Sequence, residues 1–97
     1  MFVGYQRVAV GPAVTNLAGV IAVPAGTARV QLQSDLLNVR YTMDGVTNPN
    51  AGFGMLLLNG QTPEWFELAD LQRMRAISVG ALSGLNVHYY APSPLSV

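Results

Sequence analysis

The chain has 97 residues and a mass of 10.3 kDa, enough for a single domain with a modest core. Its five basic residues are all arginine, its five acidic residues balance them, and cysteine is absent, which excludes disulfides, thiolate catalysis and sulfur-ligated metal sites. Only 10% of the residues are charged and 51% are hydrophobic, whereas soluble proteins carry about a quarter charged residues. This composition indicates a subunit whose surface is partly covered by other protein, and the scattered arginines disfavour nucleic acid as a partner.

The N-terminal part is expected to hold a free arm and two strands. Residues 1–6 precede the first alternating pattern and are predicted to form an N-terminal arm. Residues 7–10 and 19–23 are predicted strands joined by a loop of small residues. The longest apolar stretch, residues 17–25, is too short to span a bilayer, and the first ten residues lack the pattern of a signal peptide, so we expect no contact with a membrane.

Two alternating segments are predicted to be neighbouring strands. In residues 27–34 the apolar side chains fall on every second position, which is typical of a half-buried strand. Residues 37–43 alternate in the same way and are followed by the turn signal Asp44-Gly45. The inward-facing residues predicted for the two strands are Ala28, Val30, Leu32, Leu37, Val39, Tyr41 and Met43.

The next two segments differ in pattern. Residues 53–58 form a continuous apolar run bounded by Asn59-Gly60, which predicts a strand covered on both faces or a central strand of a sandwich. Residues 64–68 are a further predicted strand, in which Trp65 and Phe66 point to opposite faces. One of these two large aromatic side chains is therefore left for solvent or for a partner, although Trp65 in the core remains an equal alternative.

A helical turn, two strands and a second arm complete the chain. Residues 69–74 have the spacing of one helical turn, and residues 75–79 and 85–90 alternate as strands. Residues 91–97 contain two prolines, which oppose sheet pairing, and are predicted to form a C-terminal arm. The expected fold is all-β: a single compact β-sandwich, jelly-roll or Ig-like, of about eight short antiparallel strands over residues 7–90.

The side chains that could act in catalysis or bind a metal do not form a predicted active site. His88 is the lone histidine and is expected on the outer face of the last strand, at the surface or in an interface. The oxygen-rich loop 44–50 suits a structural turn better than a cation site. Arg40 and Asp44 are expected to form a salt bridge that holds this turn. We therefore expect no catalytic residue, cofactor, bound metal or small-molecule substrate.

A wider pattern extends over about residues 7–90. Its features are Val23-Pro24-Ala25-Gly26, Val39-Arg40-Tyr41 with Asp44-Gly45, the loop proline Pro49, Gly54 to Leu57 closed by Gly60, and Leu85-Asn86-Val87 followed by Tyr89-Tyr90. In these features the chain resembles a group of small structural proteins encoded in the virion gene clusters of tailed bacteriophages. Members of that group often carry an acidic pair before the turn glycine, where this chain has Met43-Asp44.

The resemblance implies a structural role without enzymatic activity. The first expectation is a capsid decoration, or cement, protein that oligomerises, as a trimer, and binds the major capsid protein to stabilise the shell. Such a protein is made in the host cytoplasm and is located on the capsid surface of the virion. The alternative is a neck, tail or fibre module that binds a tail protein, or a host receptor or glycan, through the loops 42–52 and 59–63.

Aromatic side chains and the two arms are the expected partner contacts. Interface energy concentrates in large aromatic residues and arginine, and aromatic residues within or beside the arms are the natural anchors. The predicted partner-binding residues are Phe2, Tyr5, Trp65 or Phe66, Tyr90, Pro92 and Leu95.

Overall fold

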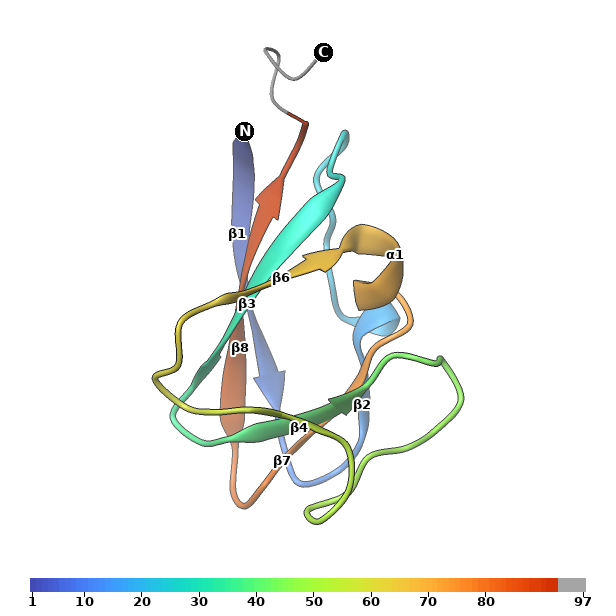
Figure 1. Cartoon of the computed structure of the whole chain (residues 1–97), viewed down its shortest axis with the longest axis vertical. Coiled ribbons are helices and arrows are strands. Elements are labelled where there is room, and N and C mark those ends of the chain that lie inside the picture. The colour runs from blue at the N-terminus through green and yellow to red at the C-terminus, as the bar shows by residue number, and fades with distance from the viewer. Residues whose placement is uncertain (93–97) are drawn as a thin grey trace.

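Two four-stranded antiparallel sheets face each other in the computed structural model, which describes residues 1–92 (Figure 1). This arrangement confirms the predicted all-β sandwich. Sheet A has the strand order β1 (Phe2–Val10), β8 (Ser83–Tyr90), β3 (Arg29–Asp35) and β6 (Glu64–Glu67). Sheet B has the order β2 (Thr15–Asn16), β7 (Arg75–Ser78), β4 (Val39–Thr42) and β5 (Met55–Leu57).

The core lies between the inner faces of the two sheets. Alternate residues of β3 and β8 point into it, as the period-two pattern predicts, and Tyr89 is fully buried there. The Tyr89 hydroxyl donates a hydrogen bond of 2.8 Å to Oε1 of Gln6, so its polar end is satisfied inside the sandwich. The buried hydrophobic cluster consists of Val8, Val10, Leu17, Val30, Leu32, Val39, Tyr41, Leu57, Phe66, Leu71, Met74, Ala76, Leu85, Val87 and Tyr89.

The N-terminal residues are part of sheet A, so the predicted arm at residues 1–6 is wrong. Strand β1 begins at Phe2 and pairs with β8 along its length, and the N-terminal amine of Met1 donates to the carbonyl of Ala91 at 2.7 Å. The register shifts between Phe2 and Gly4. Such a bulge interrupts the alternation of side chains, which hides the start of the strand from a pattern search. Of the predicted C-terminal arm, residues 93–97 lie outside the described residues.

The strand predicted at residues 19–23 is also wrong. A short 3₁₀ helix, Leu17–Gly19, lies there instead, and residues 20–28 form no strand before β3 begins at Arg29. The side chain of Gln6 takes the place of a strand partner: its Nε2 donates to the carbonyl of Val20 at 2.8 Å, and its Oε1 accepts from the N–H of Ala22 at 2.9 Å. One side-chain amide thus satisfies backbone groups that a sheet would otherwise pair.

The two strands predicted to be neighbours lie in opposite sheets. Strand β3 pairs with β8 and β6, whereas β4 pairs with β7 and β5. The connection contains Leu36 with a φ of 83°, a left-handed conformation that leucine rarely adopts. This turn carries the chain from one sheet to the other rather than into a hairpin.

The apolar run at residues 53–58 forms an edge strand, not the central strand expected from it. Strand β5 has a neighbour only on its β4 side in sheet B, and the side chain of Met55 is 62% exposed. Helix α1 (Leu68–Leu71) and strand β7 confirm the helical turn and the strand predicted after it. None of the helices within residues 1–92 has the length and hydropathy required to cross a membrane.

Candidate binding face

The outer face of sheet A carries its side chains in rows that the strand register defines. Tyr5 lies opposite His88, which lies opposite Gln31, which lies opposite Trp65. The neighbouring rows follow from the same pairing. One contains Phe2, Tyr90, Arg29 and Glu67, and the other contains Arg7, Asn86 and Gln33. Four strands from distant parts of the chain therefore contribute to one surface.

Five aromatic rings gather in two of these rows, and we call them the aromatic face: Phe2, Tyr5, Trp65, His88 and Tyr90. The ring of Phe2 meets that of His88 edge to face at 5.0 Å between centroids, and Tyr5 meets His88 at 5.5 Å. Across the sheet the rings of Tyr90 and Trp65 are 4.7 Å apart. These contacts hold the rings in place, because each such pair contributes about 0.5–1.5 kcal/mol.

The aromatic face is open to solvent. The exposed fractions are 50% for Phe2, 56% for Tyr5 and 47% for Trp65. The guanidinium of Arg29 lies 4.8 Å from the centroid of the Trp65 ring, a cation–π contact. Exposed aromatic rings gathered in this way are typical of surfaces that bind another molecule, and this face is therefore the candidate site.

Four of the predicted partner contacts, Phe2, Tyr5, Trp65 and Tyr90, come together here. Phe66, the other member of the predicted pair, is buried at 9% exposure and meets the ring of Tyr41 at 5.6 Å. Trp65 is therefore the exposed one of the two, and the prediction that they point to opposite faces is confirmed. Pro92 is exposed at the end of the described chain, and Leu95 lies beyond the described residues.

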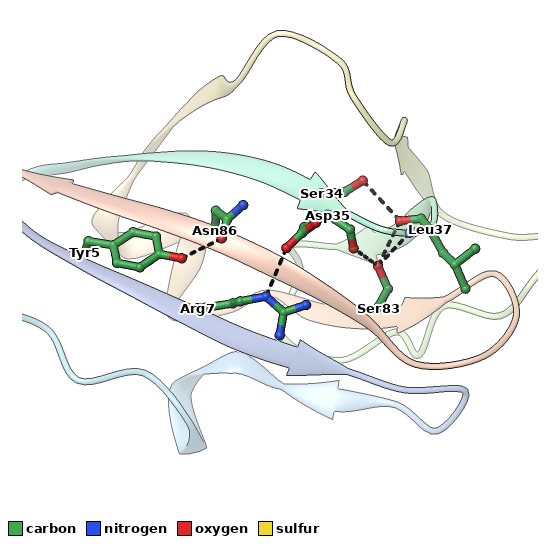
Figure 2. A network of polar contacts seen from close by, with 7 residues as sticks. All are labelled: Tyr5, Arg7, Ser34, Asp35, Leu37, Ser83 and Asn86. Carbon is green, nitrogen blue, oxygen red and sulfur yellow. Dashed lines mark hydrogen bonds and ion pairs between the residues drawn. The ribbon is translucent and has the colours of Figure 1, made fainter.

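The charged residues at the other end of sheet A neutralise each other (Figure 2). Nε of Arg7 donates to Oδ2 of Asp35 at 3.0 Å, and this pair is partly exposed. Next to it the hydroxyl of Tyr5 donates to Oδ1 of Asn86 at 2.7 Å, which orients the phenol at the rim of the aromatic face. The outer face of sheet A therefore presents aromatic rings and amides, with Arg29 and Glu67 in the aromatic rows and the paired Arg7 and Asp35 beside them.

A groove of about 230 Å³ crosses this surface between the rows. It is lined by Tyr5, Gln31, Gln33, Pro63, Asn86 and His88. The sequence pattern alone places Gln31 and Gln33 on the polar side of one strand and Asn86 and His88 on the outer side of another. It does not show that these strands are neighbours, so this groove could not be found from the sequence.

The salt bridge predicted between Arg40 and Asp44 does not form. Arg40 instead donates to the carbonyl of Ala51 at 3.0 Å and to that of Gly54 at 2.9 Å, and so braces the loop after β4. The carboxylate of Asp44 accepts hydrogen bonds from the N–H groups of Val46 and Thr47. The acid is thus satisfied within its own turn, while the long arginine side chain reaches across the loop.

The same turn explains the acidity of Asp44. Hydrogen bonds from the hydroxyl and backbone of Thr47, and then from the backbone of Val46, lower the pKa of Asp44 to about 2. All of these bonds favour the charged carboxylate. Within the described part of the chain, no group of three or more histidine or acidic side chains is placed to hold a metal ion.

Comparisons of the chain with protein-family models, curated proteins and solved structures find no match.

Proposed function

We propose that the chain is a non-enzymatic structural protein of a tailed-phage virion, a capsid decoration protein that binds the major capsid protein through the aromatic face. The observation that carries this proposal is the gathering of exposed aromatic rings, with Arg29 over Trp65, on the outer side of one sheet. Tryptophan, tyrosine and arginine dominate the energy of protein interfaces. The phage pattern along residues 7–90 supports the assignment to a virion.

The aromatic face suits binding without large rearrangement. Its rings belong to a four-stranded sheet and pack against one another, so ordering them in a complex costs little conformational entropy. A protein that binds only the assembled shell stabilises that state by mass action. At a free concentration of 100 times Kd the gain is about 2.7 kcal/mol per site, and it is repeated over every site on the shell.

Contacts between copies of the chain are part of the proposal, with a trimer expected. The edge strand β5 and the residues beside it carry exposed apolar side chains, namely Phe53, Met55, Leu56 and Leu58. An edge strand of this kind, without charged side chains to protect it, favours association with another strand. Strand β5 belongs to sheet B and the aromatic face to sheet A, so a second copy and the shell are assigned to different sheets.

The first experiment is a count of this chain in purified particles of the phage that encodes it, by quantitative mass spectrometry against the major capsid protein. A ratio within a small factor of that protein is expected for a decoration protein. A ratio typical of a neck, tail or fibre protein would favour the alternative role in the tail or in host recognition. Absence from the particle would contradict a virion role altogether.

The second experiment tests the docking surface with purified shells. Tyr5→Ala is expected to weaken binding by at least about 2 kcal/mol if Tyr5 is an anchor of the interface. Arg73→Ala is the matched control, because Arg73 is exposed after helix α1 and lies outside sheet A. Equal binding by the two variants would contradict docking through the aromatic face.

A further inference from the structure

The groove in sheet A is lined by side-chain amides in which one of the two groups, the oxygen or the NH₂, has a hydrogen-bond partner and the other has none among the described residues. Oδ1 of Asn86 accepts from the hydroxyl of Tyr5, which leaves the Asn86 NH₂ group as a donor. Nε2 of Gln33 donates to the carbonyl of Gln61 at 3.4 Å, which leaves the Gln33 oxygen as an acceptor. The internal bonds orient both amides, and the remaining halves have no other partner among the described residues.

Gln31 adds a second donor to the groove. Its Oε1 faces the hydroxyl of Tyr90 at 3.5 Å, so its NH₂ group is the half left for a ligand. Gln33 pairs with Asn86 in the register, and Gln31 pairs with His88 one row away. The floor of the groove therefore offers a donor, an acceptor and a further donor within two neighbouring rows of the sheet.

The groove also selects against charge. Apart from the imidazole of His88, the residues that line it carry no ionisable group other than the phenol of Tyr5, and Arg7 nearby is already paired with Asp35. A charged group brought into the groove would lose water without gaining a counter-ion, which is unfavourable. Its walls, Pro63 and the ring of Tyr5, offer apolar contact.

We propose that this groove receives an extended, uncharged segment of the partner's polypeptide chain. The inference rests on the proposed docking of the aromatic face to a shell protein, and it names the element of the partner that is recognised. An extended peptide presents N–H and C=O groups in alternation, which matches the donors and acceptor left free on Asn86, Gln33 and Gln31. This recognition is of the main chain, with apolar side chains resting on Pro63 and Tyr5.

The dimensions agree with such a segment. The groove runs from Tyr5 on β1, across β8 and β3, to Pro63 immediately before β6. Strands lie about 4.8 Å apart, so three intervals span about 14 Å, and an extended chain rises about 3.3 Å per residue. About four residues of a partner would therefore cross the sheet, nearly perpendicular to its strands.

The aromatic rings favour a peptide over a sugar as the occupant. A sugar ring stacks on an open aromatic face, but Arg29 covers one face of Trp65, and Tyr5 meets its neighbour edge to face. The ring of Tyr90 is tilted by 57° against that of Trp65, so the two do not form a flat platform. Main-chain recognition needs only the amides of the groove floor.

Photocrosslinking on the shell tests the inference directly. p-Benzoylphenylalanine is placed at position 62, an exposed residue beside the groove residue Pro63, so that Gln31, Gln33 and Asn86 stay intact, and, as a control, at position 73 outside sheet A. After irradiation on purified shells, crosslinked peptides are identified by mass spectrometry. Crosslinks from position 62 are expected in one short contiguous segment of the capsid protein. A synthetic peptide of that segment should then shift the side-chain amide NMR signals of Gln31, Gln33 and Asn86.

A second variant tests the hydrogen bonding. Asn86→Asp replaces the free donor by an acceptor of the same shape, and is expected to weaken binding to shells by about tenfold or more. Urea unfolding of the same variant shows whether it is folded, and the crosslinking result does not depend on it.

The outcomes separate the inference from the function on which it rests. Intact shell binding with crosslinks scattered over distant segments, or with none from position 62, would overturn the peptide groove and leave the proposed docking standing. If the unmodified chain does not bind shells at all, both the peptide groove and the proposed docking are overturned. The isolated protein is also titrated with maltopentaose, cellopentaose and chitotetraose. Shifts of the groove amides with a sugar and not with the crosslinked peptide would overturn the inference in favour of a glycan.

Discussion

The adjacent aromatic residues Trp65 and Phe66 of β6 should separate binding from folding. Phe66 is 9% exposed and belongs to the core cluster, so Phe66→Ala is expected to lower the free energy of unfolding by about 3–5 kcal/mol. Trp65 is 47% exposed, and its packing on Tyr90 and Arg29 is confined to the outer face. Trp65→Ala therefore removes a side chain that is only about half buried, and is expected to cost half of the value for a fully buried aromatic residue, or about 1.5–2.5 kcal/mol.

For binding to the shell, Trp65→Ala should have the larger effect and Phe66→Ala the smaller one. If Trp65 anchors the interface, Trp65→Ala is expected to cost at least about 2 kcal/mol of binding free energy, or about thirtyfold in Kd. Phe66 faces the core, so among molecules that remain folded the Phe66→Ala variant should bind nearly as the unchanged protein does.

Two measurements check this pair. Urea unfolding at 25 °C, with unchanged slopes, reports the stability of each variant. Co-sedimentation with purified shells, without urea and at a temperature at which both variants are folded, reports binding. The reasoning is refuted if Trp65→Ala destabilises the fold as much as Phe66→Ala does, or if it leaves the affinity for the shell unchanged.

Three further predictions concern the turns of the sandwich. Ser83→Ala should cost about 2–3 kcal/mol in urea unfolding, because its buried hydroxyl donates to the carbonyl of Asp35 at 2.6 Å and accepts a backbone N–H; a loss below about 0.5 kcal/mol would contradict this. Because Thr47 lowers the pKa of Asp44 from 3.8 to about 2, the stability due to Asp44 is present above about pH 4 and lost as the pH falls toward 2. Asp44→Asn should therefore weaken the acid dependence of unfolding measured between pH 6 and 2, and an unchanged profile would count against the turn geometry. Leu36→Gly should raise stability by about 0.5–1 kcal/mol, because Leu36 is exposed and has a φ of 83°; a thermal melt with a lower Tm would show that the strain argument is wrong.

The candidate site was only partly visible in the sequence. Large aromatic residues in a chain with few charges indicated a partner surface, and the alternation in residues 85–90 placed His88 and Tyr90 on an outer face. The grouping of these two with Phe2 and Trp65 depends on the register of β1 with β8 and on the order of strands in sheet A. That register joins residues far apart in the chain, and no local pattern contains it.

The errors in the predicted fold have the same origin. The bulge near Gly4 hid the beginning of β1, and the side chain of Gln6 replaced a strand at residues 20–22. Arg40 and Asp44 were expected to pair because they are close in sequence, but each found backbone partners that only the folded loop provides. In each case the backbone conformation or the pairing of the folded chain, rather than the local residue pattern, decided the outcome.

By itself, the sequence determined the all-β class, the position of most strands and which side of β3 and β8 faces the core, because alternation of side chains is a property of each strand alone. Tertiary structure alone decided that β3 and β4 belong to different sheets, that β5 is an edge, and that rings from β1, β8 and β6 share one surface. These features depend on pairing between strands, and pairing is set by the packing of the whole chain around one core.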